Sequence, residues 1–341
     1  MKMTRALLTG PRSFQIEEHS APEAGPQDVL IDIHTCGVCP SDVRFYSGTR
    51  AGATYPRTLG HEWVGRVIDV GGDVSRFAVG DRVAAFVQRV CGMCRNCQRG
   101  MSNMCLNRLP AIEGGFQTVG RAVSDALEPI PDDTPYEAAA FAEPLACCLN
   151  GISRTPIVPG DTVVLMGVGP IGQLLSQLAQ LRGGKVIAVD MIPERLELAM
   201  ELGASEGLNA ADPDLVKKIQ DLTGGFGAEA VIVAVGVPAA ELQALELAAP
   251  GGYVNYFAGT YPSATIAMDP NVIHYRQLWV TGSYHFTPGG FRTALDLIAR
   301  EEVQVQPLIS HRLGLDEIAH GFDTVIDQAG MKVIIEMGDG G

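Results

Sequence analysis

The chain has 341 residues, 46% of them hydrophobic and 19% charged, which is enough for about two domains with packed cores and excludes a disordered chain. Its net charge of −14 argues against nucleic acid or an anionic membrane as a partner. No run of about 18 apolar residues predicts a membrane span, and the first residues lack the apolar core of a signal peptide. We therefore expect a cytoplasmic protein, whose clustered cysteines favour metal over disulfides.

The first part of the chain, to about residue 150, is predicted to be rich in β-structure. Residues 28–35 alternate between apolar Val29, Ile31 and Ile33 and their neighbours, which is typical of a half-buried strand. Residues 60–74 and 78–86 show strand-like patterns as well. Glycines and prolines recur at intervals of about 8–12 residues, so we expect a barrel-like β fold here.

Beyond this point the pattern changes to alternating strands and helices. Short apolar strands are expected at 161–166, 185–190, 228–235, 251–259 and 277–284. Helices are expected at 171–182, 193–203, 241–248 and 291–302, before a last strand at 332–337. This alternation predicts an α/β domain, with a doubly wound parallel sheet covered by helices on both faces.

The first strand of this part leads into the sequence GVGPIG, a GxGxxG motif, and then into a helix. In this context Gly167 allows a tight turn, Gly169 lets the backbone approach a pyrophosphate, and Gly172 lets the helix pack on the strand. Asp190 ends the second strand, where an acid accepts the ribose hydroxyls of NAD and repels the extra phosphate of NADP. Arg195 is well placed to cover the adenine, and its alternative interpretation is a charge on the helix surface. The motif predicts NAD as a cofactor, although a Gly-rich turn can also be purely structural.

Four cysteines lie within residues 91–105, with the spacing C-x2-C-x2-C-x7-C. Four thiolates satisfy a tetrahedral zinc ion and leave no open position, so Cys91, Cys94, Cys97 and Cys105 predict a structural zinc site. The spacing matches neither ferredoxin pattern for an iron–sulfur cluster. A nucleic-acid-binding finger is the other alternative, which the acidic chain and the lack of a following recognition helix disfavour.

A second metal site is predicted from three separate motifs. They are CGVCPSD at 36–42, GHE at 60–62 and AEPLA at 142–146. Each is weak alone, because a CxxC can be redox-active and a histidine can be part of a core. Together they offer one thiolate (Cys39), one imidazole (His61) and two carboxylates (Glu62 and Glu143). Three protein ligands and one exchangeable position make a catalytic zinc site.

These motifs, in this order, resemble the zinc-dependent medium-chain alcohol dehydrogenase family, and the likeness covers nearly the whole chain. A carboxylate at Glu143, where ordinary alcohol dehydrogenases have a third zinc-binding cysteine, is similar to the sorbitol (polyol) and threonine dehydrogenase branch. The resemblance implies a GroES-like catalytic domain at 1–148, with the zinc lobe 91–105, and a Rossmann domain at 149–285. It also implies that 286–341 returns to the catalytic domain, and that the protein is a homodimer or homotetramer.

The resemblance also implies roles for individual residues. Cys39 and His61 become zinc ligands, and Glu62 and Glu143 share the remaining role, without the sequence deciding which binds directly. Asp42 orients a ligand and Ser41 passes the substrate proton outward. The cofactor is expected to contact Pro170, Ile171, Val235, Gly236, Phe257, Ala258, Gly259, Ser283, Tyr284 and His285.

The chain departs from its relatives near the substrate. Arg44 replaces a histidine that relays protons, and arginine cannot relay. Either protons leave through the cofactor ribose and water, or Arg44 binds an anionic group; the other interpretation of Arg44 is a surface charge. Gln88 replaces a histidine of the threonine dehydrogenases. Phe45 takes the place of a tyrosine that contacts substrate, and His285 and Phe286 stand where sorbitol dehydrogenases use Arg and Tyr.

The resemblance therefore implies an oxidoreductase with two zinc ions per chain. It would interconvert a secondary alcohol of a polyol, cyclitol or sugar with its ketone by hydride transfer to NAD at the cleft between the domains. One alternative is threonine 3-dehydrogenase chemistry, which Gln88 disfavours. Another is an NAD-binding protein with a structural or regulatory role and no catalysis. The identity of the substrate and the physiological direction are left open.

Overall fold

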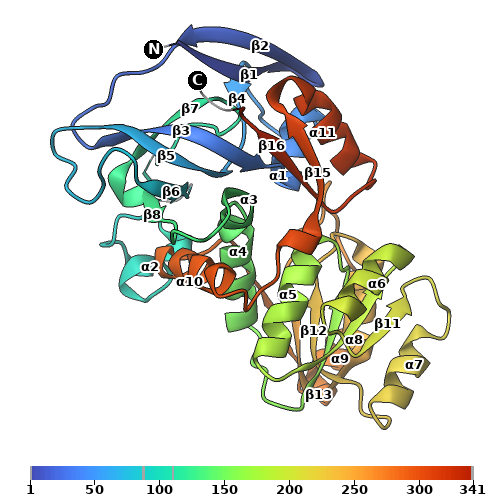
Figure 1. Cartoon of the computed structure of the whole chain (residues 1–341). Helices are drawn as coiled ribbons and strands as arrows, with labels where there is room; N and C mark the ends of the chain where they lie inside the picture. The colour runs from blue at the N-terminus through green and yellow to red at the C-terminus, as the bar shows by residue number, and fades with distance from the viewer. Residues whose placement is uncertain (1, 87–88, 110, 339–341) are drawn as a thin grey trace. The chain divides into compact units, whose positions relative to one another are not determined.

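The computed structural model describes residues 2–86, 89–109 and 111–338 (Figure 1). The chain forms two compact units. Unit 1 contains the described residues up to Ala146 together with the chain from Thr287 onward, and unit 2 contains Cys147–Phe286. Unit 1 is thus discontinuous in sequence, because unit 2 is inserted into it.

Unit 1 is mainly an antiparallel β structure. Its strands are β1 (Lys2–Gly10), β2 (Ser13–Ser20), β3 (Asp28–Gly37), β4 (Arg57–Thr58), β5 (Glu62–Val70), β6 (Arg82–Ala85), β7 (Val119–Val123), β8 (Leu127–Pro129), β15 (Ile309–Gly314) and β16 (Lys332–Glu336). Its α-helices are α1 (Pro40–Tyr46), α2 (Arg95–Gln98), α3 (Tyr136–Ala139), the start of α4 (Ala142–Ser153), α10 (Pro288–Ala299) and α11 (Ile318–Ile326).

Two sheets enclose the core of unit 1. The larger has the order β15-β16-β3-β5-β6-β8, with β7 also paired to β3, and the smaller has the order β2-β1-β4. The apolar positions predicted for strand 28–35 are buried, and Val29, Ile31 and Ile33 belong to one core cluster with Trp63 and Phe322. Because β16 pairs with β3, the last strand of the chain lies beside the strand that leads into the CGVCPSD motif.

Unit 2 contains strands and helices in alternation. They are β9 (Thr162–Met166), α5 (Pro170–Leu181), β10 (Lys185–Asp190), α6 (Pro193–Glu201), β11 (Glu206–Asn209), α7 (Leu215–Leu222), β12 (Ala228–Val233), α8 (Pro238–Leu247), β13 (Ala248–Tyr256), α9 (Pro270–Arg276) and β14 (Trp279–Gly282). All six strands are parallel, in the order β11-β10-β9-β12-β13-β14. This is the Rossmann order, and it confirms the predicted fold class.

Several elements differ from the expectations. The strand expected at 60–74 is β5, which begins only at Glu62, so His61 lies in the turn before it. The tail contains a helix, α11, which the sequence did not predict. Among the described residues, no helix combines the length and apolar character needed to cross a bilayer.

Candidate metal centres and cofactor site

The four-cysteine lobe forms a compact group of sulfur atoms. The Sγ atom of Cys94 lies 3.5 Å from that of Cys97 and 3.9 Å from that of Cys105, which in turn lies 3.5 Å from the Sγ of Cys91. A tetrahedral zinc ion with Zn–S bonds of about 2.3 Å would hold its sulfurs about 3.8 Å apart. All four thiols are free, so the group fits a zinc ion rather than disulfides.

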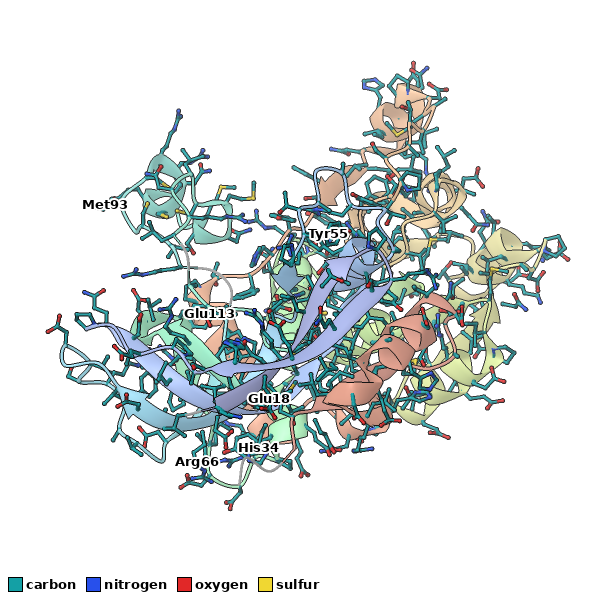
Figure 2. All side chains as sticks on the ribbon, turned by 90° about the horizontal axis from the view of Figure 1, so that it is seen from above. Glu18, His34, Tyr55, Arg66, Met93 and Glu113 are labelled. Carbon is teal, nitrogen blue, oxygen red and sulfur yellow. The ribbon has the colours of Figure 1, made fainter. Side chains whose placement is uncertain are left out.

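Backbone donors prepare this lobe for a cation. The N–H groups of Cys94 and Leu106 donate to the sulfurs of Cys91 and Cys94, at 3.3 and 3.4 Å. Hydrogen bonds from the backbone at Cys97 and Leu106 lower the pKa of Cys94 to about 6. Thiolates are the form that binds metal. Met93, which lies in the lobe and is labelled in Figure 2, is 81% exposed, and Met104 of the lobe and Leu106 directly after it are exposed as well.

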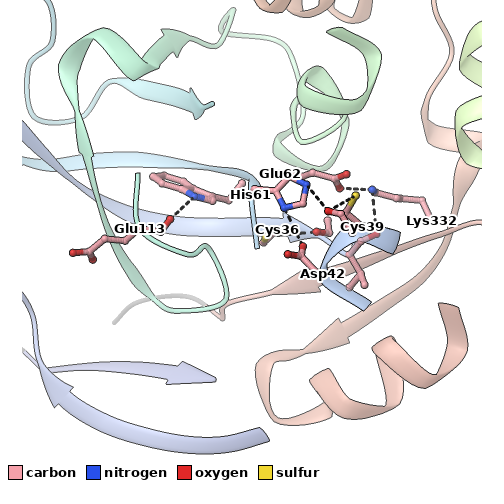
Figure 3. A network of polar contacts seen from close by, with 11 residues as sticks. Cys36, Cys39, Asp42, His61, Glu62, Glu113 and Lys332 are labelled. Atoms are coloured by element: carbon pink, nitrogen blue, oxygen red, sulfur yellow. Dashed lines mark hydrogen bonds and ion pairs between the residues drawn. The ribbon is translucent and has the colours of Figure 1, made fainter. Parts of the chain in front are cut away.

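The second group is assembled at the ends of β3 and β5. The sulfur of Cys39, a ring nitrogen of His61 and a carboxylate oxygen of Glu62 all lie within 4.8 Å of one another. Cys39 caps the N-terminus of α1, while Glu62 is the first residue of β5. Figure 3 shows the three side chains converging, together with Asp42 and Lys332. This donor set fits zinc with a fourth position open.

Two glycines make this convergence possible. Gly60 has φ of +95°, a left-handed conformation that turns the chain just before His61. Gly37 pairs with Glu62 across β3 and β5, and a Cβ atom on it would lie 2.2 Å from the Glu62 carboxylate. A side chain at residue 37 would therefore force the Glu62 carboxylate to move.

His61 is oriented through both of its ring nitrogens. Its Nδ1 atom lies 3.1 Å from Asp42 Oδ2, and its Nε2 atom lies 3.5 Å from Ser41 Oγ. Ser41 Oγ also donates to the sulfur of Cys39, at 3.3 Å. The structure thus places Ser41 beside two of the candidate ligands, with Asp42 on the far side of the imidazole ring. Such a carboxylate fixes the ring and leaves Nε2 for the metal.

The charges around the group shift its pKa values. Burial lowers the pKa of His61, but the charges of Asp42 and Cys39 outweigh burial and raise this pKa well above its usual value. Burial raises the pKa of Glu143 to about 7, and the nearby charge of His61 opposes that shift. Glu143 is 7% exposed and interacts with this group electrostatically, but it is outside the set of ligand atoms within 4.8 Å.

Lys332 is a member of this centre that the sequence did not reveal. Its Nζ atom is ion-paired with the Glu62 carboxylate and donates to the carbonyl of Val38, at 3.3 Å. The two charged side chains are only 6% and 1% exposed. Glu62 therefore has a buried cationic partner that the protein itself supplies. Cys36, by contrast, is fully buried, and burial raises the pKa of its thiol well above the usual value, so it stays a neutral thiol.

In unit 2, the GVGPIG motif forms the turn between β9 and α5. Gly167 has φ of +89°, and a Cβ atom on Gly172 would lie 2.0 Å from the Gly167 carbonyl oxygen. A Cβ atom on Gly169 would meet nothing closer than Arg195 Nη1 at 3.7 Å. Gly167 and Gly172 are therefore required by the turn itself, whereas Gly169 leaves room above the N-terminus of α5, as a bound pyrophosphate requires.

Asp190 lies at the carboxyl end of β10, beside this turn. Its two carboxylate oxygens accept hydrogen bonds from the N–H groups of Val168, at 2.8 Å, and Ile192, at 3.0 Å. Arg195 Nη1 lies 4.0 Å from the same carboxylate. Gln173, which the sequence did not single out, is fully buried and donates to the carbonyls of Val168 and Arg195. These contacts fit the ribose end of a dinucleotide.

The other predicted cofactor residues follow the carboxyl ends of neighbouring strands. Val235 and Gly236 follow β12, Phe257–Gly259 follow β13, and Ser283–His285 follow β14. Dinucleotides bind at this edge of a doubly wound sheet. Tyr284 is 61% exposed, whereas Phe286 is fully buried. Phe45 and Arg44 lie half-buried on α1, in unit 1. Gln88 is outside the described residues.

Comparison with known proteins agrees with this arrangement. Residues 25–132 match the alcohol dehydrogenase GroES-like domain, and residues 170–300 match the zinc-binding dehydrogenase family. The chain therefore belongs to the zinc-containing medium-chain alcohol dehydrogenases, and it is a zinc-dependent, NAD(P)-dependent dehydrogenase of alcohols or polyols.

Individual relatives are similar over almost their full length. The chain is 32% identical to the D-arabitol-phosphate dehydrogenase of Enterococcus avium, over 93% of this chain and 92% of that one. It is 31% identical to the sorbitol dehydrogenase of Halalkalibacterium halodurans, over 98% and 99%. A putative zinc-binding dehydrogenase of Sinorhizobium meliloti, whose structure was solved bound to NADP, superimposes with a TM-score of 0.92, at 31% identity and with 98% and 99% coverage.

Proposed function

We propose that this chain oxidises a secondary alcohol of a polyol, cyclitol or sugar to its ketone, reversibly, with NAD as hydride acceptor and zinc held by Cys39, His61 and Glu62. The observation that carries the proposal is that a cysteine sulfur, an imidazole nitrogen and a carboxylate oxygen lie within 4.8 Å of one another. The four cysteines of the lobe already form a separate group, so this second group is available for chemistry.

The residues around the second group have distinct roles. When bound, zinc supplies Lewis-acid polarisation of the substrate hydroxyl. Ser41 Oγ, within 3.5 Å of His61 and Cys39, takes the hydroxyl proton and passes it outward. Asp42 holds His61 by its Nδ1 atom, so that Nε2 faces Ser41 and the ligand group.

NAD rather than NADP is favoured by Asp190. The hydrogen bonds from Val168 and Ile192 fix the orientation of its carboxylate, which is 7% exposed. A fixed negative charge at this point accepts the two ribose hydroxyls of NAD and repels a 2′-phosphate. Arg195, beside it, covers the adenine.

A polyhydroxy substrate is favoured by the polar character of the centre. Two buried carboxylates, Glu62 and Glu143, lie near His61, and Glu143, which is outside the group of ligand atoms, provides an acceptor for a hydroxyl next to the one that reacts. The relatives named for sorbitol and for D-arabitol phosphate support the same class. We also expect a homodimer or homotetramer, which light scattering of the purified protein would measure.

The test is NADH formation by the purified, zinc-loaded enzyme across neutral polyols, cyclitols and sugars, with simple alcohols and L-threonine alongside. We expect turnover of a polyhydroxy substrate and a higher kcat/KM with NAD than with NADP. Ser41→Ala should lower kcat by roughly 10²- to 10⁴-fold, whereas Ser13→Ala, at an exposed serine of β2, should not. Turnover of threonine alone, or an intact kcat in Ser41→Ala, contradicts the proposal.

A further inference from the structure

A local excess of positive charge lies next to the candidate zinc centre. Residues 43–60 contain Arg44, Arg50 and Arg57 and no acidic residue, in a chain whose net charge is −14. This segment covers the end of α1 and the loop that returns to His61 through β4. Three arginines in one segment without an acidic residue favour the approach of anions to this part of the protein.

Two of these arginines flank the ring of Phe45. The guanidinium carbon of Arg57 lies 3.9 Å from the ring centroid, and that of Arg50 lies 5.4 Å from it. Tyr55 (labelled in Figure 2) donates from its hydroxyl to the Phe45 carbonyl at 2.7 Å and so fastens the loop to α1. Both guanidinium groups therefore make cation–π contacts with the Phe45 ring.

Phe45 also relates these arginines to the reacting end of the substrate. It follows Ser41 by four residues on α1, so the two side chains share one face of the helix, about 6 Å apart along its axis. Ser41 lies against Cys39 and His61. The face of α1 that carries Ser41 and Phe45 therefore leads from the candidate zinc ligands toward the arginines.

In the parts of the chain that the structure describes, no carboxylate lies within 4.0 Å of the guanidinium of Arg50 or Arg57. Arg57 Nε is buried and has no hydrogen-bond partner there. A buried donor without an acceptor is costly, and a planar guanidinium fork matches a carboxylate or phosphate.

We propose that Arg57, assisted by Arg50, binds an anionic group, a phosphate or carboxylate, at the end of the substrate away from the reacting hydroxyl. The preferred substrates are then polyol phosphates or sugar acids rather than neutral polyols. This inference rests on the proposed function, because it concerns the same site, and it narrows the substrate class to anionic polyhydroxy compounds.

The experiment compares three forms of one carbon chain: the neutral polyol, its terminal phosphate monoester and the corresponding sugar acid. Wild type should show a higher kcat/KM for one anionic form than for the neutral one, and the choice between the two identifies the group. Arg57→Met should reduce the ratio of anionic to neutral kcat/KM by about 10- to 150-fold, as expected for hydrogen bonds to a charged group. Arg57→Lys, which keeps the charge but loses the fork, should reduce it less.

Arg300→Met is the matched control, because it removes one exposed positive charge from the same unit, on the residue that follows α10. It should leave the ratio at the wild-type value. If Arg57→Met does not fold, Arg50→Met tests the same subsite from the exposed side of the ring. Raising the ionic strength should lower the wild-type preference for the anionic form.

Calorimetric binding of the phosphate monoester and of the sugar acid to the zinc-loaded protein separates this inference from the proposed function. Tighter binding of either anion to wild type than to Arg57→Met supports the subsite even if no substrate turns over. The lack of turnover would then contradict only the proposed function. Equal turnover of neutral and anionic forms, unchanged in Arg57→Met, overturns the subsite and leaves the dehydrogenase proposal standing.

Discussion

Replacing Lys332 by methionine removes the only positive charge that an ion pair supplies to Glu62 among the described residues. Methionine keeps most of the volume of the lysine stem, so packing changes little. The Glu62 carboxylate, 1% exposed in its side chain, would be left buried without its cation, and the Val38 carbonyl would lose the donor 3.3 Å away. The effect should therefore be electrostatic rather than steric.

The expected cost follows from this burial. Breaking a buried ion pair by removing one partner costs about 3–5 kcal/mol. Unit 1 has roughly 200 residues, and a domain of that size loses about 2–4 °C in thermal midpoint per kcal/mol. Lys332→Met should thus lower the midpoint of the zinc-free protein by about 6–20 °C. Zinc bound at Cys39, His61 and Glu62 supplies positive charge to the same carboxylate, so the loss should be smaller in the zinc-loaded protein.

Thermal unfolding measures how strongly Lys332 and Glu62 stabilise one another. The four proteins compared are wild type, Lys332→Met, Glu62→Gln and the double variant, each with and without zinc. The double variant should recover much of the stability that Lys332→Met loses, because no buried charge is then left alone. Two results would refute the reasoning. One is a Lys332→Met midpoint close to that of the zinc-free wild type, and the other is simple addition of the two single effects in the double variant.

The remaining predictions address other parts of the molecule. Cys94→Ser should lower the zinc content, measured by atomic absorption, from two ions per chain to one, and retention of two ions would contradict the lobe assignment. Gly172→Ala should weaken NAD binding and also lower the thermal midpoint, because the added Cβ would lie 2.0 Å from the Gly167 carbonyl oxygen; unchanged NAD titrations would count against the cradle. The bidentate hydrogen bonds from Arg312 lower the pKa of Glu137 from its usual 4.5, so the pair stabilises the fold above that pH and stops doing so as pH falls through the lowered pKa. Arg312→Met should therefore cost no more than about 1 kcal/mol at neutral pH and less in acid, measured by urea unfolding, and a larger deficit in acid would be the wrong sign.

Most of the nucleotide-binding unit could be predicted from the sequence because its signals are local, although β11, α7 and α9 were not predicted. A buried parallel strand appears as a continuous apolar run, as in 161–166, and the GVGPIG turn follows directly. Unit 1 was harder. Helix α11 contains Gly321, Thr324 and Val325, which disfavour a helix, and it forms because Ile318 and Phe322, four residues apart, pack into the core.

The candidate zinc centre likewise contains residues that the sequence predicted and one, Lys332, that it did not. Cys39, His61 and Glu62 lie in short motifs whose chemistry can be recognised one motif at a time. Lys332 could not be predicted, because it starts an ordinary strand 270 residues away from Glu62, and only the pairing of β16 with β3 brings the two together. The contacts of Arg57 depend likewise on how the loop after α1 folds back over Phe45.

Because unit 2 is inserted into unit 1, the nucleotide-binding unit can be completed before the candidate zinc centre during synthesis. Ribosomes add about 5–20 residues per second, so Lys332 emerges about 15–50 s after Glu62, its partner 270 residues earlier. Unit 2 is contiguous and can fold within that interval. The nascent chain would therefore have a finished nucleotide-binding unit while the zinc centre still waits for its last strand, so a metal ion that arrives early would meet Glu62 without its lysine.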